Sequence, residues 1–137
     1  MTTDWAAPRK PALAFSDAGF AAAKVWFFDR WAGWAATRGL ERPIDLSGSC
    51  KYGSLFMQAV FGGAVHGHFE HQYNLIDGRI VDLSHDAMDV GRMRNPYLHE
   101  PDYFRLEALQ ASLSGCQPRA ERWAVEFIAS RAGQPVS

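Results

Sequence analysis

The sequence is short of cysteine, of excess charge and of uninterrupted apolar stretches. Its 137 residues include two cysteines, too few for a disulfide framework, and 14 lysines and arginines against 15 acidic residues leave a formal net charge of −1. Proteins that bind nucleic acid usually carry a basic excess, so we expect no nucleic-acid partner. The most apolar segment, 20–36, is interrupted by Lys24, Asp29 and Arg30, so we expect no membrane association.

We also expect no secretory signal, because Asp4 comes early and no sustained apolar run follows it. With so little cysteine, this indicates a cytoplasmic protein. Bulky apolar residues are abundant: nine Phe, five Trp and four Tyr provide a core without disulfides or a structural metal. We therefore expect one domain, 1–137, in which residues 1–15, with Pro8 and Pro11, form a loosely ordered arm.

Two helices are predicted in the first half of the chain. Ser16-Asp17 can cap a helix that carries apolar residues at spacings of three and four and is stopped by Gly39. A second helix is expected from Cys50 to the Gly62-Gly63 pair, with Ser47 or Ser49 as its cap.

The pattern then changes to strands, at 64–69, 71–76 and 79–83, and Asp77-Gly78 is typical of a two-residue hairpin turn. Beyond 84–101, which is irregular, we expect a helix over 102–113, a break at 114–118 and a last amphipathic helix. Helices around a small antiparallel sheet define an α+β class.

The hairpin brings a histidine and a carboxylate together. A two-residue turn pairs residue 76 with residue 79, so His71 and Asp82 become diagonal neighbours on one face of the sheet. An aspartate at that distance can accept a hydrogen bond from the imidazole, fix its tautomer and favour the imidazolium.

Cys50 adds a candidate nucleophile. A thiol in the first turn of a helix feels the free N–H groups and the positive end of the helix dipole, which favour the thiolate. If that end of the helix packs against the hairpin, His71 becomes the base for Cys50 and Asp82 orients His71. The alternative for these three residues is structural: a small buried cysteine, a strand histidine and an acid near a turn.

Three short motifs support the catalytic interpretation. Gly48-Ser49-Cys50 opens a helix, and His71-Gln72-Tyr73-Asn74 and Asp82-Leu83-Ser84 lie on the strands that follow. In this order the chain resembles the transglutaminase-like superfamily of papain-type cysteine enzymes. Over about residues 46–110 it is similar to the YunG-like family of small bacterial proteins, a likeness that also includes Phe61-Gly62-Gly63 and Asp77-Gly78.

The resemblance implies a transglutaminase-like core, with Cys50 as nucleophile, His71 as base and Asp82 as orienting residue. The resemblance implies no substrate. From the chemistry of a cysteine thiolate we expect a peptide or a small-molecule amide or ester, and no cofactor. Tyr73 and Asn74 are the candidate substrate-binding residues. In the wider superfamily an aromatic residue often follows the histidine directly, whereas here Gln72 intervenes.

Two other interpretations stay open. The same fold could serve as a non-catalytic domain that binds a peptide or small molecule between the helix and the hairpin. Alternatively, His66, His68 and His71 could contribute to a metal site, although their spacing matches no dedicated motif. A metal-bound His71 could not also act as a base for Cys50.

Overall fold

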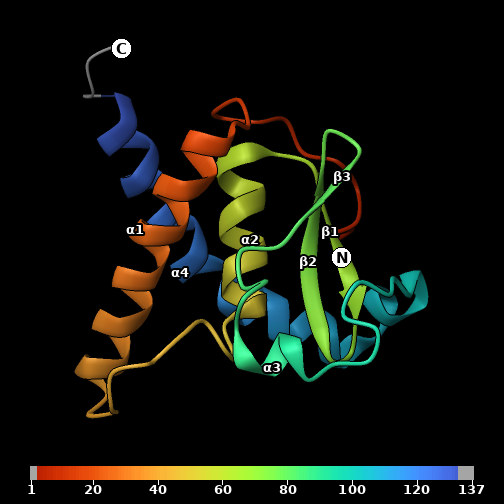
Figure 1. Ribbon diagram of the computed structural model, residues 1–137. Coiled ribbons are helices and arrows are strands. Elements are labelled where there is room, and N and C mark those ends of the chain that lie inside the picture. The colour runs from red at the N-terminus through yellow and green to blue at the C-terminus, as the bar shows by residue number, and fades with distance from the viewer. Residues whose placement is uncertain (1–2, 133–137) are drawn as a thin grey trace.

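The computed structural model describes residues 3–132, which form four α-helices and a three-stranded antiparallel sheet of strand order β1-β2-β3. This confirms the predicted α+β class. The elements, in chain order, are α1 (Asp17–Thr37), α2 (Cys50–Phe61), β1 (Ala64–His68), β2 (His71–Ile76), β3 (Arg79–Val81), α3 (Met88–Gly91), the 3-10 helix η1 (Pro101–Arg105) and α4 (Glu107–Ala132) (Figure 1).

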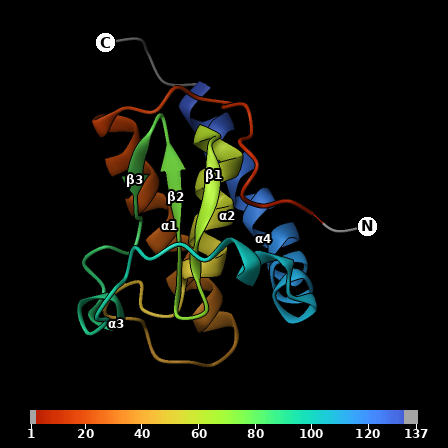
Figure 2. The same cartoon turned by 90° about the vertical axis from the view of Figure 1, so that its right-hand side faces the viewer.

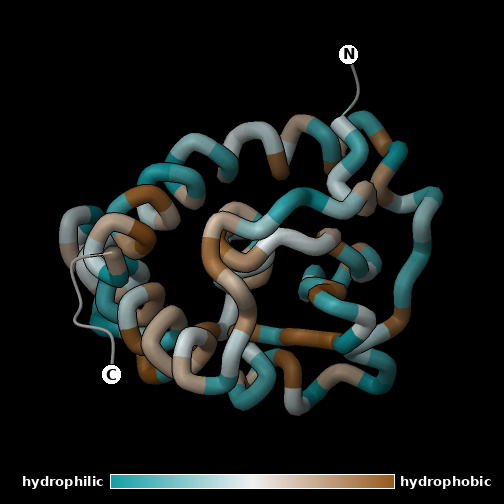
Figure 3. The backbone as a smooth tube through the Cα atoms, turned by 90° about the horizontal axis from the view of Figure 1, so that it is seen from above, coloured by the Kyte–Doolittle hydropathy of each residue, from teal (hydrophilic) through white to brown (hydrophobic). Residues whose placement is uncertain are grey.

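Helix α2 occupies the middle of the molecule. The sheet covers one side of it, and α1 and α4 lie on the other (Figures 1 and 2). Every residue from Gly53 to Phe61 is buried. A helix that is covered on all sides must be apolar around most of its circumference, and this stretch of α2 meets that requirement. Seen from above, segments of hydrophobic residues occur in the middle of the molecule and also along the elements around it (Figure 3).

Aromatic rings join the three long helices. The ring of Phe27 in α1 lies 5.3 Å from that of Phe56 in α2 and 5.6 Å from that of Trp123 in α4. Phe27 is fully buried, and Trp31 and Trp34 pack partly buried against the same core. The apolar stripe predicted for the first helix is therefore a core face.

The local signals at the first helix and at the hairpin are confirmed. The Ser16 hydroxyl accepts a hydrogen bond from the backbone N–H of Gly19 at 3.0 Å, which caps α1. Asp77 and Gly78 both have positive φ, 53° and 75°, as a type I′ turn requires. The register pairs Ile76 with Arg79, as predicted.

The predicted break at 114–118 is wrong. Helix α4 runs without interruption from Glu107 to Ala132, with Pro118 inside it. Pro118 lacks the N–H that would bond to the preceding turn, but Leu113 and Ala120, on either side of it, are fully buried in the core. Packing therefore outweighs the local cost of the proline. The expected helix start at 102 is also wrong, because Asp102 lies in η1.

The predicted arm, residues 1–15, is described from residue 3 onward, since residues 1 and 2 lie outside the described range. The segment is non-helical, but Trp5 is 2% exposed and belongs to the core. Arg9 forms a β-bridge with Gly63, and its guanidinium pairs with Glu121 of α4 at 2.6 Å. The first part of the chain thus closes one edge of the sheet.

The long helices do not have the composition of membrane spans. Helices α1 and α4 have 21 and 26 residues, lengths that would suffice for a bilayer. Within residues 3–132, however, no helix is both long and apolar enough to cross one.

We predict that Gly63→Ala lowers the free energy of unfolding more than Gly78→Ala does. Both glycines have a left-handed φ, +71° and +75°, but a Cβ at Gly63 would lie 2.3 Å from the carbonyl oxygen of Leu75, whereas the space around Gly78 is open. Gly78→Ala should lower the free energy of unfolding by about 1 kcal/mol, because alanine disfavours a left-handed φ. Gly63→Ala adds the steric clash and should lower it by about 3 kcal/mol or more. Urea denaturation of the two variants measures the difference, and equal losses would contradict the packing.

Candidate active site

Cys50 is the first residue of α2, as the sequence predicted, but the side-chain cap is absent. Ser49 occupies the capping position, yet its hydroxyl donates to the carbonyl oxygen of Leu46 at 2.7 Å instead of accepting from the helix. The hydroxyl of Ser47, the other candidate, accepts from the backbone N–H of Asp89. No side chain therefore caps the start of α2, and the positive end of its dipole stays directed at the Cys50 thiol.

Two carboxylates hold the loop that leads into Cys50. Asp45 accepts hydrogen bonds from the backbone N–H groups of Met88 and Ser47, both at 2.9 Å, and Asp89 accepts from that of Gly48 at 2.8 Å. The bonds from Met88 and Ser47 lower the pKa of Asp45, so it stays ionised at neutral pH. The start of α2 is thereby fastened to α3.

His71 and Asp82 form the pair that the hairpin register predicted. Nε2 of His71 lies 2.8 Å from Oδ2 of Asp82, and the two side chains are 1% and 4% exposed. Since Asp82 occupies Nε2, Nδ1 is the nitrogen left to face another group. A buried histidine and carboxylate at this distance share one proton in a strong hydrogen bond.

The electrostatics favour a protonated His71. Burial by itself lowers the pKa of His71, but hydrogen bonding and charge attraction from Asp82 and from nearby Cys50 raise it to about 9. Burial likewise raises the pKa of Asp82, and the bonds from His71 and Ser84 outweigh this and lower it. Asp82 is therefore ionised at neutral pH, and His71 carries the positive charge when Cys50 is a thiolate.

Asp82 is oriented by the turn that ends β3. Its Oδ1 accepts hydrogen bonds from both the backbone N–H and the hydroxyl of Ser84, each at 3.1 Å, which leaves Oδ2 for His71. This side-chain turn stops the strand at Val81, shorter than the predicted 79–83. The Asp-x-Ser spacing was the sequence signal for it.

The Cys50 thiol donates a hydrogen bond to Gln72, at 3.2 Å from Sγ to Oε1. Gln72 is buried at 2% exposure and was not among the predicted site residues. Its side chain reaches back to the hairpin, where Nε2 donates to the carbonyl oxygen of His68 at 2.7 Å. Cys50 thus lies beside two potential acceptors of its proton, His71 and Gln72.

Tyr73 and Asn74, predicted to bind substrate, are both buried and bonded internally. The Tyr73 hydroxyl donates to the backbone carbonyl of Tyr97 at 2.7 Å, and the Asn74 amide donates to that of Ser54 at 2.9 Å. Their polar groups already have partners within the protein, and a substrate contact by either residue stays a prediction. Asn74 joins β2 to α2, and Tyr73 joins β2 to the loop before η1.

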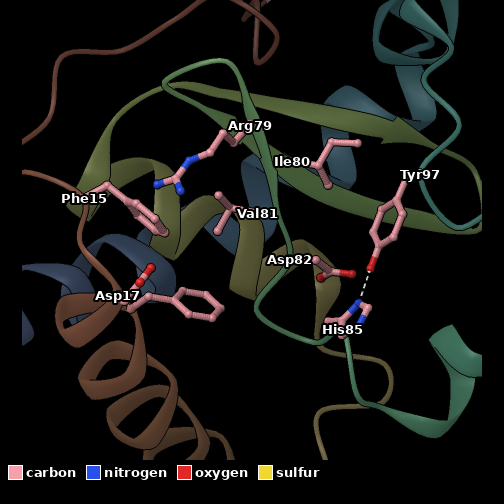
Figure 4. Close-up of a pocket in the computed structure, with 9 residues that line it drawn as sticks. Phe15, Asp17, Arg79, Ile80, Val81, Asp82, His85 and Tyr97 are labelled. Atoms are coloured by element: carbon pink, nitrogen blue, oxygen red, sulfur yellow. Dashed lines mark hydrogen bonds between the residues drawn. The ribbon is translucent and has the colours of Figure 1, made fainter.

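Tyr97 covers the pair from that loop. Its ring centroid lies 6.3 Å from that of His71. Burial and the negative charge of Asp82 raise the pKa of Tyr97 to about 12, so its hydroxyl stays protonated at neutral pH. The same hydroxyl forms a hydrogen bond of 2.6 Å with Nδ1 of His85 (Figure 4). No local sequence signal indicates this contact, because it joins residues distant in the chain.

A cavity of about 410 Å³ opens beside Asp82. Phe15 and Arg79 lie at one end of it, and Tyr97 and His85 at the other (Figure 4). Neither Cys50 nor His71 lines it. A ligand in this cavity would therefore meet the orienting carboxylate and not the thiol.

The three histidines considered for a metal site have separate environments. His66 stacks on His99 with ring centroids 3.8 Å apart, His68 is buried with Nε2 unpartnered, and His71 is bonded to Asp82. Among residues 3–132, no three histidine, cysteine or acidic side chains lie close enough together to hold a metal ion.

The second cysteine, Cys116, lies within helix α4, where the sequence predicted the break at 114–118. It is 9% exposed, and burial raises the pKa of its thiol. Cys116 is therefore an internal reference for the reactivity of Cys50.

Comparison of the chain with protein-family models, with curated proteins and with solved structures finds no match. The transglutaminase-like interpretation therefore depends on the motifs and the geometry of this chain.

We predict that the pair stabilises the fold in a pH-dependent way. Because the folded-state pKa of His71, about 9, exceeds the ordinary 6.5, its contribution is fully present below pH 6.5 and is lost as the pH rises through 9. The stability advantage of wild type over His71→Asn should therefore shrink by roughly 2–3 kcal/mol between pH 6.5 and 9.5.

Urea unfolding at the two pH values measures this change. Asp82→Asn provides a second test, because without the carboxylate the pKa of His71 falls and the alkaline loss of stability becomes smaller. A difference between wild type and His71→Asn that is constant with pH would show that His71 is not charged in the folded protein.

Proposed function

We propose that this protein is a cysteine-dependent amide or acyl hydrolase, or an acyl transferase, that uses Cys50, His71 and Asp82. The observation that carries the proposal is the buried 2.8 Å pair of His71 and Asp82 beside a cysteine at the start of a helix. The order helix, strand, strand supports a transglutaminase-like core related to the YunG-like family. A reducing cytoplasm would keep both cysteines as the free thiols seen here.

The chemistry begins from the Cys50 thiolate paired with the His71 imidazolium, in which Nδ1 of His71 holds the proton of the thiol. The sulfur then attacks the carbonyl carbon of the substrate, and the carbonyl electron pair moves onto oxygen, where the backbone N–H of Cys50 is a candidate donor. Collapse of this intermediate breaks the bond to the leaving amine or alcohol, which takes the proton from His71. A thioester on Cys50 remains.

The second half restores the thiol. His71 removes a proton from water or from a second amine as it attacks the thioester, and the sulfur leaves and recovers the proton from His71. Water gives hydrolysis, and an amine gives transfer. Asp82 stabilises the imidazolium in both halves without itself becoming protonated.

We predict that Cys50 is alkylated by iodoacetamide at pH 7 about tenfold faster in the folded protein than in the same chain unfolded in urea. The ion pair with His71 is the reason, so His71→Asn should remove the advantage. Mass spectrometry of the two cysteine peptides measures both rates, with Cys116 slow in the folded state because it is buried. Equal Cys50 rates in wild type and His71→Asn would contradict the proposal.

We also predict that an activated ester, p-nitrophenyl acetate, acetylates Cys50 with a burst of p-nitrophenol. Cys50→Ser should abolish the burst, Cys116→Ser should leave it unchanged, and Asp82→Asn should slow it by tenfold or more because His71 loses its orienting partner. The adduct is located by peptide mass spectrometry. Acetylation spread over lysines, with none on Cys50, would count against the enzyme.

One observation favours the alternative of a non-catalytic binding domain: the Cys50 thiol has an acceptor other than His71, the amide oxygen of Gln72. Under that interpretation Cys50 fills a polar position in the wall of a binding site. Reactivity of Cys50 that does not depend on His71, combined with no ester adduct, would support it.

A further inference from the structure

The Gln72 contact has a defined direction. Nε2 of Gln72 lies 2.7 Å from the carbonyl oxygen of His68, which can only accept a hydrogen bond. The amide nitrogen must therefore face His68, and the amide oxygen must face the sulfur of Cys50. Reversing the amide would place two oxygen atoms against each other in a buried site, so the side chain has one orientation.

The position of Gln72 on the sheet holds that orientation. Gln72 pairs with Gly67 in the β1–β2 register, in the hairpin that carries His68, and its side chain is almost fully buried. The acceptor is therefore attached to the same strand as His71, one residue further along the chain.

An acceptor that faces a thiol stabilises only one protonation state. The carbonyl oxygen of Gln72 bonds to S–H, whereas a thiolate would face the negative end of the amide dipole with no proton between them. Asp82 and His71 act in the opposite direction, because they stabilise the imidazolium that accompanies the thiolate. Gln72 therefore favours the protonated thiol of Cys50, whereas the His71–Asp82 pair favours the thiolate.

We propose that Gln72 is a positioning residue that favours the protonated Cys50 thiol over the thiolate, and so opposes the His71–Asp82 pair, in the ligand-free protein. This inference rests on the proposed function only in treating Cys50 as the nucleophile. It means that Cys50 is less reactive than the His71–Asp82 pair alone would make it, and that loss of the thiol proton requires the hydrogen bond to Gln72 to break.

The test compares alkylation of Cys50 by iodoacetamide between pH 5 and 10 in wild type and Gln72→Met, which has a similar volume but no amide. We expect Gln72→Met to shift the rate profile to lower pH and to raise the Cys50 rate at pH 6 by roughly three- to tenfold. Gln72→Asn, whose shorter amide cannot span both His68 and Cys50, should change the profile in the same direction and provides a second variant.

Gln58→Met is the matched control. Gln58 is also a buried glutamine that donates to backbone carbonyls, those of Trp5 and Gly63, but it lies in the last part of α2. This variant should lower stability without moving the Cys50 profile, so loss of a buried amide alone does not mimic the effect.

An unchanged profile, or a shift to higher pH, in folded Gln72→Met would overturn the inference, because Gln72 would then be neutral toward the thiolate or would stabilise it. The result is separable from the proposed function. If the ester forms no adduct on Cys50 but Gln72→Met still shifts the alkylation profile, the role of Gln72 stands and the enzyme does not. If the adduct forms on Cys50 but Gln72→Met does not shift the alkylation profile, the proposed enzyme activity is supported and the role of Gln72 is wrong.

Discussion

Burial of α2 on every side is the constraint on which the rest of the structure depends. The sheet must bury its apolar face, and so must α1 and α4. The twelve-residue helix α2 packs against all of them (Figure 1). Neither face of α2 can shift without opening a gap in a close-packed interior. The first turn of α2, and with it Cys50, is therefore held at one place relative to β2, while the loop before it is fastened to α3 by Asp45 and Asp89.

The candidate site balances burial against pairing. Removing His71 and Asp82 from water disfavours the charged form of each, yet the short contact between them reverses both pKa shifts. Ser84 donates to the second oxygen of Asp82, so both carboxylate oxygens have a hydrogen-bond partner. Such a pair is strongly oriented because every alternative position would leave a buried charge without a partner. Orientation is what a base must have if it is to accept a proton from one particular sulfur.

The parts of the fold that follow local rules could be predicted from the sequence. Gly62-Gly63 ends α2, Asp77-Gly78 sets the hairpin register, and the alternation of side chains brings His71 onto the same face as Asp82. The continuity of α4 through Pro118 could not be predicted, because it depends on residues of other elements that cover the helix.

The same limit applies to the site. Tyr97 reaches the pair from a loop whose course is set by contacts distant in the chain, and Gln72 was noted only as an interruption between His71 and Tyr73. Its importance depends on where α2 places the sulfur, which strand periodicity does not specify. Trp5 lies in the core although Pro8 and Pro11 follow it. Proline prevents a helix in this segment but does not prevent a neighbouring side chain from packing into the core.

The pairing of the N-terminal segment with β1 has a consequence for how this sheet behaves toward other molecules. Arg9 bonds to Gly63, and the carbonyl oxygen of Trp5 accepts from Val65, so the outer side of β1 is already occupied by the protein's own backbone. The opposite edge is β3, which is three residues long before Asp82 turns the chain away. A sheet with one side occupied and the other so short offers little template for strands of a neighbouring copy, and this protects a chain rich in aromatic residues from edge-to-edge aggregation.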